Sequence, residues 1–177
     1  MLKLKGTNIQ LRALEPEDLN FLYQIENNEN LWEVSNTQTP YSRFLLKQYL
    51  ENAHLDIYEA KQLRLAIENN QGVLVGLIDL FDFNPQHLRA GIGILIAPEH
   101  QQKGYALQAI QLAQNYAFSV LNLQQVYANI DTKNKQSIHL FEKLGYQYVG
   151  TRKNWIYNNH AFKDVAFYQL IYPSNIS

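Results

Sequence analysis

The sequence predicts one mixed α/β domain that spans residues 1–177. Segments in which apolar and polar residues alternate are interleaved with segments in which apolar residues recur every three or four positions, which are the patterns of strands and helices. Hydrophobic residues make up 46% of the 177 and charged residues 18%, a balance that suits one buried core and argues against a disordered polyelectrolyte. The predicted order is strand, two helices, three strands, helix, strand, helix and two strands.

The charge balance and the residue types present argue against several classes of protein. Lys and Arg number 15 and Asp and Glu 16, so a nucleic-acid partner is not expected. Cysteine is absent, which removes disulfides, thiolate metal sites and cysteine nucleophiles. The five histidines show no paired ligand spacing, so no metal is expected. Because neither a signal peptide nor a run of ~18 apolar residues is found, we expect a cytoplasmic protein without a membrane partner.

The first third of the chain predicts a strand and two helices. Alternating apolar residues predict a strand over residues 8–14. Proline at the first helical position and two acidic residues in the first turn predict a helix over residues 16–26. Residues 27–39 are polar and break the periodicity, and Ser42 is the expected N-cap of a second helix that ends near Ala53.

The middle of the chain predicts a β-hairpin followed by a glycine-containing strand. The hairpin strands are predicted over residues 63–67 and 73–81, and the Asn-Asn-Gln-Gly sequence between them contains residues that tolerate positive φ. A further strand is predicted over residues 90–96. Its two glycines, Gly91 and Gly93, permit a bulge or the close approach of a ligand to the backbone.

The C-terminal part of the chain predicts two further helices and three strands. Apolar residues at three- and four-residue spacing predict a long helix over residues 104–121, which is followed by a strand over 125–130. The glycine-containing strand, the long helix and the next strand form a βαβ unit, and such units gather ligands at the carboxyl ends of their strands. A helix over residues 137–144 and closing strands over 146–150 and 165–172 complete the domain.

The segment Gln101-Gln102-Lys103-Gly104-Tyr105-Ala106 joins the first strand of this unit to its helix. A helix N-terminus presents unpaired N–H groups and the positive end of the macrodipole, so a tight turn at Gly104 would wrap a pyrophosphate with backbone donors. Small Ala106 leaves room for the phosphates, and Lys103 adds a positive charge at the rim. An ordinary strand–turn–helix connection would use the same residues, and the hexapeptide alone leaves both interpretations open.

Three spaced motifs and a further residue pair resemble the GNAT superfamily of N-acetyltransferases. The pattern Gln101-x-x-Gly104-x-Ala106 resembles the acyl-CoA pyrophosphate loop of that superfamily. Further segments on both sides of this loop resemble other motifs of the superfamily. They are Gly91-Ile92-Gly93-Ile94-Leu95-Ile96, Asn134-x-x-Ser137-x-x-x-Phe141-Glu142-Lys143-Leu144-Gly145-Tyr146 and Asp164-Val165. The resemblance covers roughly residues 73–172 and is closest to the branch that contains ribosomal-protein-alanine and spermidine acetyltransferases.

The resemblance implies a fold and an activity. The fold is a central, twisted, mostly antiparallel sheet of about seven strands with one splayed parallel pair, flanked by about four helices. The activity is transfer of an acetyl group from acetyl-CoA to a primary amine by direct attack, without a metal. The acceptor would be a polyamine or other small amine, or a protein N-terminus. Because edge strands of this fold often pair between subunits, a homodimer is expected from the resemblance.

The resemblance also implies which residues bind acetyl-CoA. The pantetheine arm lies between the splayed strands, and a backbone N–H near Leu95 would stabilise the oxyanion that develops on the thioester. The implied cofactor-binding residues are Ile94, Leu95, Ile96, Gln101, Gln102, Lys103, Gly104, Tyr105, Ala106, Asn129, Asn134, Ser137 and Phe141.

The candidate acid and base come from different segments. Many relatives carry Tyr at the position of Phe141, where this sequence has no hydroxyl. Ser137 matches a serine of the ribosomal-protein branch and is the candidate that stabilises or protonates the leaving thiolate, and a helix-capping hydroxyl is the alternative. Asp79 lies inside an apolar strand and is the candidate base if it is buried near the cleft, and a strand-edge residue is the alternative.

Residues near the first helix and in the last hairpin are candidates for acceptor binding. Glu33 suits a cationic amine, and Trp32, Tyr41 and Trp155 would line or close the acceptor groove. Solvated charge and core packing are the alternatives for these residues. Because Phe141 replaces the usual Tyr, a catalytically weak acyl-CoA sensor or interaction module is the alternative to an enzyme.

Overall fold

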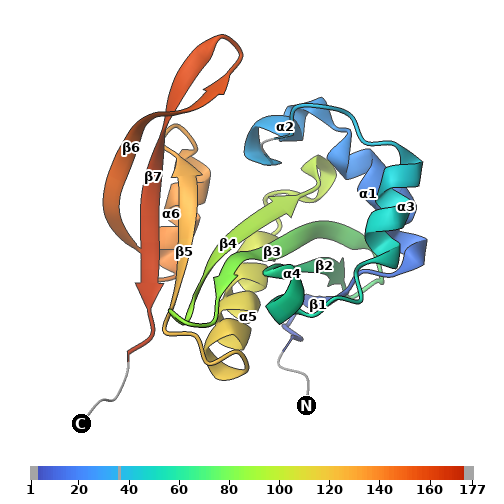
Figure 1. Cartoon of the computed structure of the whole chain (residues 1–177), viewed down its shortest axis with the longest axis horizontal. Helices are drawn as coiled ribbons and strands as arrows, with labels where there is room; N and C mark the ends of the chain where they lie inside the picture. Colours follow the sequence, from blue (N-terminus) through green and yellow to red (C-terminus); the bar gives the residue numbers. More distant parts are fainter. Residues whose placement is uncertain (1–3, 36, 174–177) are drawn as a thin grey trace.

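In the part of the chain that the structure describes, seven strands form one sheet in the order β1-β2-β3-β4-β5-β7-β6 (Figure 1). The computed structural model describes residues 4–35 and 37–173; Asn36, inside the predicted break at 27–39, and residues 1–3 of the N-terminus lie outside the described residues. Neighbouring strands are antiparallel except for β4 and β5, which are parallel. The predicted mostly antiparallel sheet with one parallel pair is therefore confirmed.

The strands lie where apolar alternation predicts them. They are β1 (Ile9–Ala13), β2 (Leu63–Asn69), β3 (Leu74–Asn84), β4 (Arg89–Ile96), β5 (Gln125–Asp131), β6 (Gln147–Asn158) and β7 (Ala161–Ile171). β6 and β7 are longer than predicted, because they continue into a hairpin whose turn is formed by Asn159 and His160, both with positive φ.

Within the described residues six α-helices flank the sheet, where about four are predicted. They are α1 (Leu19–Glu26), α2 (Glu29–Ser35), α3 (Arg43–Glu51), α4 (Ile57–Ala60), α5 (Tyr105–Ser119) and α6 (Lys135–Lys143). The predicted helices are α1, α3, α5 and α6, and Ser42 caps α3 by accepting a hydrogen bond from the Leu45 N–H at 3.1 Å. Within residues 4–35 and 37–173, no helix has both the length and the apolar character needed to cross a bilayer.

The two additional helices form where the sequence has no helical period. α2 is held by tertiary contacts, because Leu31 is buried in a cluster with α1 residues and Trp32 donates its indole N–H to the Glu26 carbonyl at 2.8 Å. α4 is a single turn whose first N–H groups are capped by the side chain of Asp56. The prediction that the whole of residues 27–39 is irregular is therefore wrong where α2 forms.

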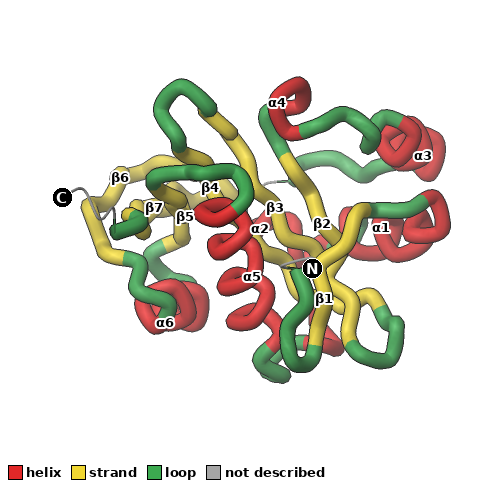
Figure 2. The backbone as a smooth tube through the Cα atoms, turned by 90° about the horizontal axis from the view of Figure 1, so that it is seen from below, coloured by secondary structure: helices red, strands yellow, loops and turns green. Residues whose placement is uncertain are grey.

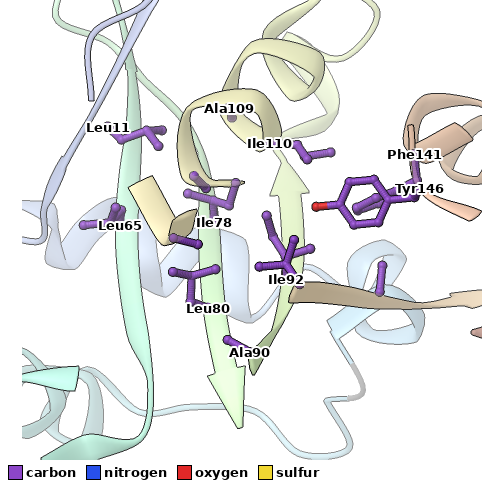
Figure 3. Packing of buried hydrophobic residues seen from close by; sticks show 14 of the residues in the cluster. Leu11, Leu65, Ile78, Leu80, Ala90, Ile92, Ala109, Ile110, Phe141 and Tyr146 are labelled. Atoms are coloured by element: carbon purple, nitrogen blue, oxygen red, sulfur yellow. The ribbon is translucent and has the colours of Figure 1, made fainter. Parts of the chain in front are cut away.

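Two hydrophobic clusters cover opposite faces of the sheet. Ile78 and Leu80 of β3 pack in one cluster with Ala109 and Ile110 of α5 (Figure 3). Leu77 packs in the other, with residues of α1 and α3. Because successive side chains of a strand point to opposite faces, β3 holds α5 on one side of the sheet and α3 on the other (Figure 2).

β4 and β5 separate along their length. Their ladder has three pairs, of which Gly91 with Tyr127 is the last, and beyond it the strands diverge (Figure 1). The β3–β4 ladder continues to Ile96, so the C-terminal half of β4 has a strand on one side and a wedge on the other. The splayed parallel pair implied by the resemblance is confirmed, and it turns backbone groups of β4 towards the wedge.

The irregularity expected at the glycines of β4 lies instead in β3. The β3–β4 register shifts between Phe81 and Asn84. The Phe81 ring covers Gly91, where an added Cβ would overlap the ring atoms. Gly91 therefore makes room for a side chain of the neighbouring strand, which corrects the expectation that it lets a ligand approach.

Candidate active site

The loop between β4 and α5 forms a backbone cradle. Gln102 and Gly104 both adopt left-handed conformations, with φ of 60° and 77°. Gly104 is the N-cap residue of α5 and supplies no capping side chain, so it leaves the first N–H groups of this helix without a side-chain cap. An added Cβ at Gly104 would meet nothing within 4 Å, so the cradle is open at this residue. Its backbone donors and the helix dipole suit a pyrophosphate.

The side chains of the loop hold the cradle in place or surround it. The Gln101 side-chain amide donates to the Ile96 carbonyl at 3.1 Å, which ties the loop to the end of β4. The other predicted loop side chains are exposed at the rim or pack partly against the core: Gln102, Lys103, Tyr105 and Ala106. Gln101 therefore positions the cradle, and the backbone at and after Gly104 forms it.

The backbone of β4 presents alternate N–H groups to the wedge. The Ala97 N–H donates to the Val75 carbonyl at 2.9 Å, and successive N–H groups of a strand point to opposite sides. The Leu95 N–H is thus directed at β3, whereas the N–H and the carbonyl of Ile94 are directed at the wedge. Of Ile94 and Leu95, it is therefore Ile94 whose N–H can reach a group in the wedge, which corrects the expectation for Leu95.

A cavity of about 790 Å³ lies in the wedge and is lined from both faces of the sheet. Its walls come from β4 and β5, from α6 on one face, and from α2 and the β6–β7 hairpin on the other. The predicted site residues that line it are Ile94, Asn129, Asn134, Ser137, Phe141, Glu33 and Trp155. The cavity therefore brings residues predicted for acyl-CoA and residues predicted for the acceptor into one space.

A lysine that the sequence did not single out also lines this cavity. Lys163 of β7 forms an ion pair with Glu33 of α2 and lies 3.9 Å from the Asp131 carboxylate at the end of β5. Its side chain is 14% exposed. Val165, two residues further along β7, lines the cavity as well, so strand alternation is the signal that would have placed Lys163 there.

The comparisons with known proteins decide the family. Residues 8–147 match the family described as an acetyltransferase (GNAT) domain. The chain belongs to the GNAT family of acetyltransferases. It is 35% identical over 160 residues to the spermidine N(1)-acetyltransferase of Vibrio cholerae, covering 90% of this chain and 91% of that protein. It is 34% identical over 157 residues to the enzyme of the same name from Escherichia coli K12, covering 89% of this chain and 82% of the relative.

A solved structure extends the similarity to the whole fold of this GNAT chain. The crystal structure of spermidine N-acetyltransferase from Vibrio cholerae, in complex with CoA and spermine, matches with a TM-score of 0.85 at 32% identity, covering 94% of this chain and 96% of that chain. The protein is therefore an N-acetyltransferase that uses acetyl-CoA, and the donors of the cradle and the open edge of β4 fit that cosubstrate. Among the described residues, no cluster of three or more His, Asp or Glu could hold a metal ion.

Helix α6 of the GNAT enzyme presents one hydroxyl side chain to the cavity. The Asn134 side chain accepts a hydrogen bond from the Ser137 N–H at 3.1 Å, so Asn134 and not the Ser137 hydroxyl caps the helix. Phe141 contacts Tyr146 edge to face, with ring centroids 4.9 Å apart (Figure 3). Burial raises the pKa of the Tyr146 hydroxyl well above its usual range, and Tyr146 belongs to the core. Ser137 is therefore the hydroxyl that α6 offers to the cavity.

Asp79, the candidate base, lies outside the cavity of this GNAT enzyme. Arg64 of β2 binds its carboxylate through Nε at 2.7 Å and through Nη2 at 3.2 Å. The same guanidinium binds Glu26 of α1 through Nη1 at 2.8 Å. The three side chains form an ion-pair network between α1 and the sheet, which gives Asp79 a structural role and corrects its assignment as the base.

Two aromatic candidates for the acceptor groove also lie elsewhere. The Trp32 indole is used in the hydrogen bond to the Glu26 carbonyl. Asn27 binds both the N–H and the carbonyl of Tyr41, at 2.8 and 3.0 Å, and Tyr41 packs against the cluster under α1 and α3. Both residues are partly buried and brace the α1–α3 region through these contacts. Of the acceptor candidates, Glu33 and Trp155 line the cavity.

Proposed function

We propose that this GNAT enzyme acetylates a primary amine of a polyamine such as spermidine. One observation carries the proposal. The same cavity is lined by Ile94 and Ser137, which are predicted to bind acyl-CoA, and by the carboxylates of Glu33 and Asp131. Carboxylates attract an ammonium group, and here they share the space in which a thioester would lie. The activity named for the Vibrio cholerae and Escherichia coli relatives supports the same class of acceptor.

The proposed roles follow from the geometry. The cradle at Gly104 binds the pyrophosphate of acetyl-CoA, and the open edge of β4 binds the pantetheine arm. The Ile94 N–H donates to the thioester oxygen, which gains negative charge as the neutral amine attacks. The Ser137 hydroxyl stabilises the thiolate as the C–N bond forms and the C–S bond breaks. The proton that the attacking nitrogen loses ends on the sulfur, so the products are the amide and the CoA thiol. Most of the acceleration comes from holding the amine against the thioester.

Release of CoA from acetyl-CoA is expected to depend on spermidine. The measurement is thiol release by the purified protein with spermidine, with butylamine and without an acceptor, together with mass spectrometry of the acetylated product. Acetylspermidine formation above the no-acceptor control supports the proposal. Turnover of a peptide N-terminus but of no polyamine would contradict the acceptor class, and CoA binding without turnover of any amine would favour the acyl-CoA sensor.

Ser137→Ala is expected to lower kcat about tenfold, because a hydrogen bond to a developing charge contributes about 1.5 kcal/mol. The affinity for acetyl-CoA and the stability should change little, since Asn134 remains as the cap of α6. Steady-state kinetics and calorimetry measure the two quantities. Ser119→Ala, at the exposed C-terminal end of α5, is the matched control, and equal kcat in the two variants would remove Ser137 from the mechanism.

We further propose that the enzyme is a cytoplasmic homodimer with one acetyltransferase domain over residues 1–177. β1 and β6 are the edge strands of the sheet, and edge strands present backbone groups for pairing between subunits. This assembly stays a prediction.

A further inference from the structure

The cavity already contains a cation at Glu33, the place where we expect the second, non-reacting ammonium of a polyamine to bind. Lys163 reaches from β7 across the cavity to the Glu33 carboxylate of α2. Its Nζ also lies 3.9 Å from the Asp131 carboxylate. With a side-chain exposure of 14%, the ammonium is largely removed from bulk water, so its two carboxylate neighbours replace much of its hydration.

The charges of the cavity wall are balanced. Among the described residues, the charged side chains that line the cavity are Glu33, Asp131, Lys133 and Lys163, two of each sign. A polyamine carries several positive charges at neutral pH. To pair one of them with Glu33 it must displace the ammonium of Lys163, because a carboxylate cannot hold two close ammonium groups without repulsion between them. The energy of the Lys163–Glu33 pair is therefore lost when the acceptor binds.

We propose that Lys163 is a specificity-determining residue that occupies with its own ammonium the place of an acceptor cation at Glu33, and so weakens the binding of polyamines relative to monoamines. The proposal deepens the proposed function and rests on it only for the identity of the acceptor. A monoamine has no second charge to place at Glu33. Its affinity therefore depends less on whether the Lys163–Glu33 pair is kept.

Lys163→Gln is the variant that tests this role. Glutamine keeps a polar side chain, one atom shorter than lysine, but removes the charge, which frees Glu33 and Asp131 to bind a cation. We expect spermidine to bind roughly tenfold more tightly, because one added charge-assisted pair contributes about that factor. The affinity for butylamine should change less than about threefold. The measurement is calorimetric titration of each amine into protein saturated with CoA, which needs no turnover.

Three further variants make the result specific. Lys163→Arg keeps the charge and should bind spermidine within about twofold of the wild type. Lys153→Gln removes a charge from β6 that is 78% exposed and paired with Asp164 at 3.0 Å, so it controls for net charge alone and should also stay within twofold. Adding Glu33→Gln to Lys163→Gln should abolish most of the gain, because the freed carboxylate is lost.

The outcomes separate this inference from the proposed function. If Lys163→Gln, and the second neutral variant Lys163→Met, bind spermidine no more tightly than Lys153→Gln while binding CoA normally, the role of Lys163 is overturned. That result leaves acetylation of polyamines by the wild type untouched. If the wild type acetylates no polyamine but both neutral variants gain affinity for spermidine, the acceptor proposal fails and the role of Lys163 stands.

Discussion

Gly104→Val is expected to abolish measurable binding of acetyl-CoA. Gly104 has φ of 77° and starts α5, and a β-branched side chain is strained in this left-handed conformation. The Cβ would also project into the open side of the cradle, where nothing lies within 4 Å, and would take the place of the phosphates. Both effects remove backbone donors from the pyrophosphate. Calorimetric titration with acetyl-CoA measures the loss.

The chain offers a close control for this variant. Gly72, in the turn between β2 and β3, has φ of 74° and likewise nothing within 4 Å of an added Cβ. Gly72→Val should therefore lose about as much stability as Gly104→Val, about 1–2 kcal/mol, and keep its affinity for acetyl-CoA. Equal affinities of the two variants would show that the α5 cradle does not bind the cosubstrate.

Arg64→Leu is expected to lower the free energy of unfolding by about 3 kcal/mol, and the melting temperature by about 10 °C. Arg64 binds Glu26 and Asp79 at 2.8 and 2.7 Å, and these carboxylates are only 10% and 21% exposed. Removal of the guanidinium leaves two like charges close together and poorly hydrated. Thermal and urea unfolding measure the loss, and α1 should be the element that loosens, because Glu26 belongs to it.

Two comparisons identify the source of that loss. Arg43→Leu removes a guanidinium that donates to Asn20 at the surface and lies over the Tyr23 ring, and it should cost less than about 1 kcal/mol. Combining Arg64→Leu with Glu26→Gln and Asp79→Asn should recover part of the stability, since the unpaired charges are then gone. A triple variant less stable than Arg64→Leu would show that repulsion between the carboxylates is not the cause.

The long, regular elements of this protein could be predicted because their information is local. The sequence of α5 repeats apolar residues at helical spacing over several turns. The β2–β3 hairpin has two segments of alternating apolar and polar residues on either side of a turn sequence. α2 and α4 could not be found in this way. With seven and four residues they are too short to show a period, and α2 is helical because Leu31 and Trp32 find partners in α1.

The difference between local and long-range information also explains which residues of the candidate site could be predicted from the sequence. The cradle at Gly104 was expected from the family resemblance, since the hexapeptide alone left an ordinary turn equally open; its geometry is local, because a helix N-terminus and a left-handed glycine act through adjacent backbone groups. The direction of each β4 N–H could not be predicted from the sequence. The oxyanion donor was expected at the Leu95 N–H, one residue away from the Ile94 N–H that faces the wedge. A shift of one residue reverses the side to which a strand directs its N–H groups, and the pairing partner that sets it is in another strand.

By itself the sequence determined the order of the main elements and the resemblance to the GNAT superfamily, from which the pyrophosphate cradle at Gly104 was expected. Only the tertiary structure decided which charges meet: Asp79 is held by Arg64, and Glu33 by Lys163. These partners come from separate elements of the sheet and its helices. A charge acts over a few ångströms in space irrespective of its distance along the chain, so the role of each carboxylate depends on packing that no local pattern records.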